Sequence, residues 1–148
     1  MQGPAGQYPT LQVHPGRRCN LQCLHCYSDS GPAVSEQLEI DLLEGVVADA
    51  AAIGYRVMSV SGGEPLLYPG LAQLLRAAHT SGLVTTVTTN GMLLDQRQLN
   101  VLGADCDLVA ISLDGIPESH NFMRNSTRAF DDMCARLPAP RASGIPFG

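Results

Sequence analysis

The sequence contains no lysine, so all nine of its basic residues are arginine. They stand against 14 acidic residues, which gives a formal net charge of -5 at pH 7. Proteins that bind nucleic acid usually gather positive charge on one face, because contacts to phosphate supply much of their affinity. Because basic residues are not in excess over acidic ones, the composition argues against nucleic acid as a partner.

Long apolar runs are missing as well. No stretch approaches the roughly 20 apolar residues that a membrane-spanning helix needs. The beginning, Met1-Gln2-Gly3-Pro4, has neither the basic region nor the apolar core of a signal peptide. We therefore predict no membrane partner and a cytoplasmic location. The five cysteines agree, because an odd number fits thiol or metal chemistry better than a disulfide scaffold.

The chain has no internal repeats, low-complexity tracts or evident linkers. Its 148 residues amount to about one domain, and a hydrophobic content of 45% suits a compact fold. Short apolar runs alternate with helical periods, which is typical of an α/β protein with a parallel sheet. The predicted strands cover residues 10–13, 57–61, 84–88 and 108–113, and a fifth strand opens at 145–147.

Four helices are predicted between and after these strands. Ser35 is the expected N-cap of the first, which ends at Gly54 and whose buried face is expected to carry Leu38, Leu42, Val46, Ala50 and Ile53. The second covers residues 71–80 and buries Leu71, Leu74, Leu75 and Ala78. The third follows its cap Asp95 and carries Leu99 and Leu102. The fourth covers residues 130–137 and precedes Pro138.

Three of the five cysteines, Cys19, Cys23 and Cys26, stand in a CxxxCxxC spacing. Thiolates are the ligands that iron–sulfur clusters select, and a cubane cluster is ordinarily held by four. Three thiolates would leave one iron open to a small chelating ligand. A Cys₃His zinc site that includes His25 is the alternative, although adjacent residues are hard to aim at one tetrahedral ion. Isolated cysteines are usually small buried apolar residues, and we expect this of Cys106 and Cys134.

The cysteine spacing resembles the radical S-adenosylmethionine (radical SAM) superfamily, whose hallmark it is. The string RRCNLQCLHCYSDSG is similar to the branch with SPASM-type C-terminal cluster extensions. Further motifs of the superfamily follow apolar strands: Gly62-Gly63-Glu64-Pro65, Thr89-Asn90-Gly91 and Ser112-Leu113-Asp114-Gly115.

This resemblance implies a parallel partial (β/α) barrel, of which about four βα units are present. Residues 1–148 would then be the N-terminal part of a radical SAM core, without the last barrel strands and any auxiliary-cluster domain. Parallel strands joined by right-handed crossovers bring their carboxyl ends to one face. We therefore expect the loop that carries Cys19, Cys23 and Cys26 (the cysteine loop) and the three later motifs to meet at one site. Antiparallel pairing of these strands would contradict this expectation.

The resemblance also implies roles for individual residues. Cys19, Cys23 and Cys26 would hold a [4Fe-4S] cluster. Gly62 and Gly63 would let the backbone approach S-adenosylmethionine (SAM), and Glu64 would add an acceptor for its amino group.

The two later motifs would reach the rest of the cofactor. Ser112 and Asp114 would contact the ribose, although Asp-Gly is also a common turn. Asn90 is either a ligand or a turn residue before Gly91. Arg124 would reach the SAM carboxylate or lie exposed. His25 and Tyr27 would pack on the adenine or form an apolar lid.

The implied activity is that of a radical SAM enzyme of the oxidoreductase or maturase type. An electron donor such as flavodoxin or ferredoxin reduces the cluster, SAM is cleaved to a 5′-deoxyadenosyl radical, and that radical abstracts hydrogen from a substrate. The substrate would be a peptide or a small molecule, in the maturation of a peptide, protein or cofactor. Two alternatives stay open: a zinc- or iron-binding structural module without catalysis, and an inactive fragment of a longer enzyme.

Overall fold

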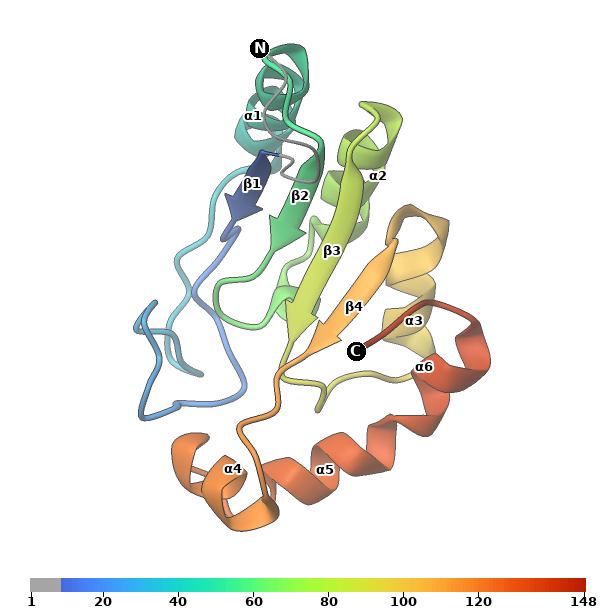
Figure 1. The fold of residues 1–148 in the computed structure, drawn as a ribbon. Helices are drawn as coiled ribbons and strands as arrows, with labels where there is room; N and C mark the ends of the chain where they lie inside the picture. Colours follow the sequence, from blue (N-terminus) through green and yellow to red (C-terminus); the bar gives the residue numbers. More distant parts are fainter. Residues whose placement is uncertain (1–8) are drawn as a thin grey trace.

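The computed structural model describes residues 9–148 and has a four-stranded sheet in the order β1-β2-β3-β4 (Figure 1). Every neighbouring pair is parallel. The predicted α/β fold with a parallel sheet is therefore confirmed. The strands are β1 (Thr10–Val13), β2 (Val57–Val60), β3 (Val84–Thr89) and β4 (Leu108–Ile111).

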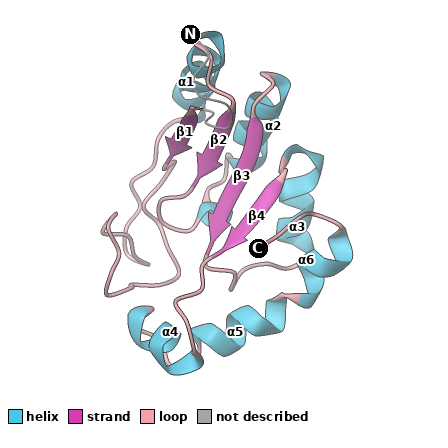
Figure 2. Ribbon diagram, viewed as in Figure 1, coloured by secondary structure: helices cyan, strands magenta, loops and turns pink. Residues whose placement is uncertain are grey.

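Three helices follow the first three strands: α1 (Ile40–Ala52), α2 (Leu71–Thr80) and α3 (Gln96–Leu102). They stand side by side behind the sheet in the view of Figure 2, with α2 between α1 and α3. The core lies between these helices and the sheet. It is built from alternate strand residues and one stripe of each helix, including Val47, Met58, Val60, Leu71, Leu75, Val87 and Val109, all completely buried.

The remaining elements are short. Two 3₁₀ turns, η1 (Pro65–Leu67) and η2 (Gly103–Asp105), follow β2 and α3. After β4 come α4 (Pro117–Met123), α5 (Ala129–Arg136) and α6 (Pro138–Ser143). Helices α4 and α5 lie below the carboxyl ends of the strands in Figure 1, whereas α6 returns to α3. The α4 segment thereby closes one side of the end of the sheet where the predicted motifs lie.

The predicted strands agree with the structure to within two residues at each end. Helix α2 has the predicted bounds and buries the predicted residues. The predicted fifth strand begins as a single parallel bridge between Phe147 and Val109, and Val109 N donates to Pro146 O at 2.9 Å. Of the two cysteines expected in the core, Cys106 is buried and Cys134 is half-buried.

The prediction for the first helix was right in its end near Gly54 and in the burial of Ala50, but wrong in its start and in the rest of its buried face. Helix α1 begins at Ile40, and it buries Leu43, Val47 and Ala50, while Leu42, Val46 and Ile53 are exposed. The segment before it is extended, because its backbone pairs with the cysteine loop. Arg17 N donates to Glu36 O at 2.9 Å, and Leu38 N donates to Pro15 O at 2.8 Å. Ser35 is therefore not a helix cap.

The region after β4 also differs from the prediction. Helix α4 was not predicted, because its one buried side chain, His120, is polar and gives no apolar period. The predicted fourth helix is confirmed as α5, which ends at Arg136 just before Pro138. Pro138 then opens the unpredicted α6, where a proline is well accommodated in the first turn.

Candidate functional site

A cavity of about 180 Å³ lies at the carboxyl ends of the strands. Its walls come from the cysteine loop and from the loops that follow β2, β3 and β4. Every predicted site residue except Asp114 lines it: Cys19, Cys23, His25, Cys26, Gly62, Gly63, Glu64, Asn90, Ser112 and Arg124. The fold thus brings the four motifs together, as the parallel topology requires.

The three cysteines of the motif are free thiols in different surroundings. Cys19 is buried, and its sulfur accepts a hydrogen bond from Leu21 N at 3.4 Å. Burial raises the pKa of Cys19. Burial would also raise the pKa of Cys26, but hydrogen bonds from Ser28 and Ser30 outweigh it and lower that pKa.

Cys23 faces the loop after β4. Its sulfur lies 4.0 Å from Nη1 of Arg124, and this guanidinium opposes the rise that burial causes in the pKa of Cys23. Sequence reasoning did not single out Ser28 and Ser30. The sequence marks them only as two serines two and four positions after Cys26. In the structure Ser28 Oγ lies 3.5 Å from the Cys26 sulfur, and Ser30 N donates to that sulfur at 3.3 Å.

The donor set fits an iron–sulfur cluster. Three free thiols line one cavity, and two of their sulfurs accept backbone N–H groups, as cluster sulfurs do. Within residues 9–148, no three His, Cys, Asp or Glu side chains converge as ligands of a single metal ion. A [4Fe-4S] cluster does not need ligands that converge on one ion, because each thiolate binds a different iron.

The double glycine after β2 seats the cysteine loop. A Cβ on Gly63 would lie 2.3 Å from Arg18 O and 2.8 Å from the carbonyl carbon of Arg17. Gly62 has φ of +113°, and its Cβ would lie 2.8 Å from Gly16 O. Backbone bonds join the same segments, from Gly63 N to Gly16 O at 3.0 Å. These glycines therefore serve the close approach of two backbones, in addition to lining the cavity.

Glu64 is buried, and its carboxylate is occupied by protein donors. Oε1 accepts from Thr89 Oγ1 at 2.7 Å and from Leu66 N at 3.2 Å, and Oε2 accepts from Asn90 N at 2.9 Å. Burial raises the pKa of Glu64, and these hydrogen bonds oppose the rise. The side chain thus ties the end of β2 to the end of β3.

Asn90 joins the loop after β3 to the cysteine loop. Its Nδ2 donates to Asn20 Oδ1 at 2.8 Å, and its Oδ1 accepts from Met92 N at 3.0 Å. Asn20 lies inside the cysteine motif and was not among the predicted residues. The amide of Asn90 therefore closes a turn and positions the neighbouring loop.

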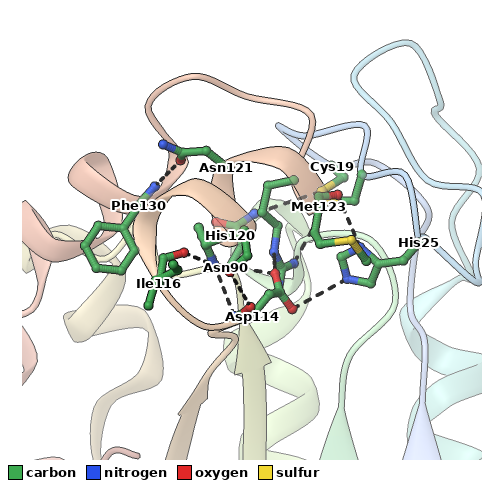
Figure 3. Close-up of polar contacts among 12 residues, drawn as sticks. Cys19, His25, Asn90, Asp114, Ile116, His120, Asn121, Met123 and Phe130 are labelled. Carbon is green, nitrogen blue, oxygen red and sulfur yellow. Dashed lines mark hydrogen bonds and ion pairs between the residues drawn. The ribbon is translucent and has the colours of Figure 1, made fainter.

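Asp114 lies outside the cavity wall, in a group of polar side chains shown in Figure 3. Its Oδ2 accepts from Arg124 Nε at 2.6 Å, and its Oδ1 lies 3.7 Å from His25 Nε2. His25 Nδ1 lies 3.2 Å from Met123 O, so the His25 ring bridges the cysteine loop and the end of α4.

Two further rings belong to the site and were missed or left without a role. His120 is 1% exposed, and burial followed by the nearby Arg124 charge lowers its pKa. His14, at the end of β1, places Nε2 3.1 Å from the Tyr27 hydroxyl, and Tyr27 lines the cavity. No motif marks either histidine, because each is placed by tertiary contacts.

Comparison with known proteins gives the family. Residues 13–147 match the Radical SAM superfamily. The chain belongs to the radical SAM superfamily. Membership implies a [4Fe-4S] cluster and SAM as the cofactors, and it places the chain in a superfamily of enzymes.

Curated relatives cover most of the chain. It is 35% identical over 143 residues to Fe-coproporphyrin III synthase of Methanosarcina barkeri (strain Fusaro / DSM 804), which covers 95% of this chain and 36% of the synthase. It is 38% identical over 98 residues to GTP 3′,8-cyclase of Chlorobaculum tepidum, and this match covers 65% of this chain and 30% of the cyclase. The chain thus spans about a third of the length of these relatives.

Solved structures share the fold. Streptococcus suis SuiB bound to precursor peptide SuiA matches with a TM-score of 0.77 at 21% identity, covering 95% of this chain and 32% of SuiB. Native anSMEcpe with bound AdoMet and Cp18Cys peptide matches with a TM-score of 0.72 at 22% identity, covering 95% of this chain and 42% of that protein. These two likenesses confirm the partial-barrel fold. Within residues 9–148, the helices are too short or too polar to cross a membrane.

Proposed function

We propose that this radical SAM chain binds a [4Fe-4S] cluster through Cys19, Cys23 and Cys26 and holds SAM in the adjoining cavity. The observation that carries the proposal is the meeting of the three thiols with the loops after β2, β3 and β4 around one cavity. When bound, the cluster supplies the electron that cleaves SAM to a 5′-deoxyadenosyl radical. We further propose that a small electron-transfer protein such as flavodoxin or ferredoxin is the donor.

The residues around the cavity divide into two groups in this proposal. Ser112 and the backbone of Gly62 and Gly63 line the cavity and contact SAM directly. Glu64 and Asn90 hold the loops at their relative positions, because their polar atoms are already engaged by protein partners. The family's contacts to the SAM amino group would then come from the backbone and side chains around Glu64.

Arg124 is the positively charged side chain of the cavity wall, and it suits the SAM carboxylate. The rings of His25 and Tyr27 also line the cavity, where they suit the adenine. The protein's part in the chemistry is to hold these groups in a fixed geometry and to limit the access of water to the cavity.

For the whole protein, we propose maturation of a cofactor precursor or a peptide. The curated relatives include Fe-coproporphyrin III synthase and AdoMet-dependent heme synthase, which favours a cofactor precursor. The structural neighbour SuiB, with its precursor peptide, supports the peptide alternative at the level of fold. Residues 1–148 would be the N-terminal part of the radical SAM core, since they cover about a third of these relatives.

The experiment is anaerobic incubation of the cluster-loaded chain with SAM and dithionite, followed by chromatography for 5′-deoxyadenosine. We expect this product from the wild type and from Cys134→Ala, which changes a half-buried cysteine outside the motif. Cys23→Ala should lose both iron and product. Equal iron and product in Cys23→Ala would refute the ligand assignment. Zinc in place of iron in the wild type would favour a structural module.

A further inference from the structure

The loop after β4 and the cysteine loop are joined by charged side chains whose roles the motifs do not explain. Asp114 is 23% exposed and Arg124 is 11% exposed, so their ion pair is shielded from water on most sides. Its Nε–Oδ2 distance of 2.6 Å is the shortest among the ion pairs of residues 9–148. A shielded, charge-assisted bond of this kind is stronger than an exposed surface pair.

The backbone of Asp114 is held in place as well as its side chain. Its N–H lies 3.3 Å from His120 Nδ1, and because a backbone N–H can only donate, that ring nitrogen is the acceptor. His120 in turn stacks edge-on against Phe130 at a centroid distance of 5.9 Å (Figure 3). The backbone of the aspartate is thus held by a buried ring, while its carboxylate points toward Arg124 and His25.

The guanidinium of Arg124 faces two ways. Nε is bound by Asp114, whereas Nη1 lies 4.0 Å from the sulfur of Cys23, and the side chain lines the cavity. Asp114 itself does not line the cavity. The carboxylate thus binds the Nε of the guanidinium, while Nη1 faces Cys23 and the Arg124 side chain lines the cavity, so the structure favours a contact to a ligand by Arg124 over one by Asp114.

We propose that Asp114 is a positioning residue that acts through Arg124. Asp114 holds the guanidinium at the cavity wall beside Cys23. There the positive charge of Arg124 faces both the Cys23 sulfur and the carboxylate of bound SAM. The contact between Arg124 and the carboxylate of bound SAM rests on the proposed function. The claim that Asp114 keeps Arg124 beside Cys23 concerns the protein alone. The competing role is the direct ribose contact that the sequence motif implies for Asp114.

The first test uses the cluster-free chain. The rate at which iodoacetamide alkylates Cys23 is followed by peptide mass spectrometry for the wild type, Asp114→Asn and Arg124→Gln. Nη1 of Arg124 lies 4.0 Å from the Cys23 sulfur, where a positive charge favours the reactive thiolate, whereas a nearby negative charge such as that of Asp114 disfavours it. If Asp114 holds Arg124 in place, both Asp114→Asn and Arg124→Gln should slow alkylation several-fold. Faster alkylation in Asp114→Asn would show that Arg124 stays beside Cys23 without the Asp114 carboxylate, and would overturn the inference.

The second test uses the cluster-loaded chain and measures the Kd of SAM by anaerobic equilibrium dialysis. Each single variant should raise Kd by about tenfold or more, since a charge-assisted bond is weakened. The double variant should bind no more weakly than Arg124→Gln alone. If the double variant instead raises the Kd by the product of the two single increases, Asp114 contacts SAM itself and the inference is wrong. Asp132→Asn, which removes the exposed pair with Arg128, is the matched control and should bind like the wild type.

The two tests separate the possible failures. A cluster-loaded wild type that does not bind SAM contradicts the proposed function, while the alkylation rates still decide whether Asp114 positions Arg124. Arg124→Lys gives a further check, because it keeps the charge and loses the Nε bond. It should restore part of the Cys23 alkylation rate, and no recovery would contradict the electrostatic role of Arg124.

Discussion

Replacing Gly63 by alanine tests how the cysteine loop is held. The added Cβ would lie 2.3 Å from Arg18 O and 2.8 Å from two backbone carbonyl carbons. Ordinary contacts of a Cβ begin near 3.4 Å, so the overlap with the oxygen is about 1 Å. The neighbouring atoms are backbone, and they can make room only if the whole cysteine loop moves away from β2.

The expected loss follows from this overlap. Forcing a methyl group into a packed site costs roughly 1–3 kcal/mol, and the rigid neighbours place Gly63→Ala at the upper end of that range. A displacement near 1 Å also exceeds the roughly 0.5 Å within which a site tolerates misplacement of its ligands. We therefore expect Gly63→Ala to lower the free energy of unfolding by about 3 kcal/mol and to lose most of its iron after reconstitution.

Gly45 provides the matched control. It lies in α1, and a Cβ there would meet nothing within 4 Å. Gly45→Ala should raise the free energy of unfolding by about 0.5–1 kcal/mol, because alanine is favoured over glycine inside a helix. Urea denaturation and iron analysis measure both variants. If Gly63→Ala has the stability and the iron content of the wild type, the account of how the loop is seated is wrong.

Two further predictions concern the thiols. In the cluster-free chain, iodoacetamide should modify Cys26 before Cys19 and Cys23, because only Cys26 has a lowered pKa; equal rates in peptide mass spectrometry would contradict this. Burial raises the pKa of Cys106 from 9.0 to about 11, so the folded state keeps its proton where the unfolded state loses it. The stabilisation from Cys106 is then full below pH 9 and falls as pH rises to 11, by at most about 2.7 kcal/mol. Denaturation of the wild type against Cys106→Ala across this window should show the difference in slope, and parallel curves would refute it.

The sheet and the site could be predicted from the sequence because local signals and topology agree. Each strand is short and rich in β-branched or aliphatic residues, and each chemical motif follows a strand end, so a parallel sheet gathers the motifs without further information. Helix α2 was predicted in full, since its leucines leave only one possible buried face.

Helix α1 could not be predicted in the same way. It is apolar on several sides, so the stripe with Leu43 and Val47 cannot be told from the stripe with Leu42 and Val46 by periodicity. Its start depends on the pairing of the preceding segment with the cysteine loop, which is a tertiary contact. The prediction failed where long-range contacts outweigh local preference.

The roles of polar residues show the same limit. The sequence places Glu64 and Asp114 at the site but does not show which partners their carboxylates take. In the structure, Glu64 binds Thr89, and Asp114 binds Arg124. These partners lie 25 and 10 positions away along the chain, so only the fold brings them together.

The measurement that tests the central claim most directly is EPR spectroscopy of the chain after anaerobic iron–sulfur reconstitution and dithionite reduction, with and without SAM. A [4Fe-4S]⁺ signal that shifts when SAM is added would show a cluster with one iron open to this cofactor, as the three thiols at the cavity predict. A protein that holds zinc, or a cluster whose signal is indifferent to SAM, would contradict the account.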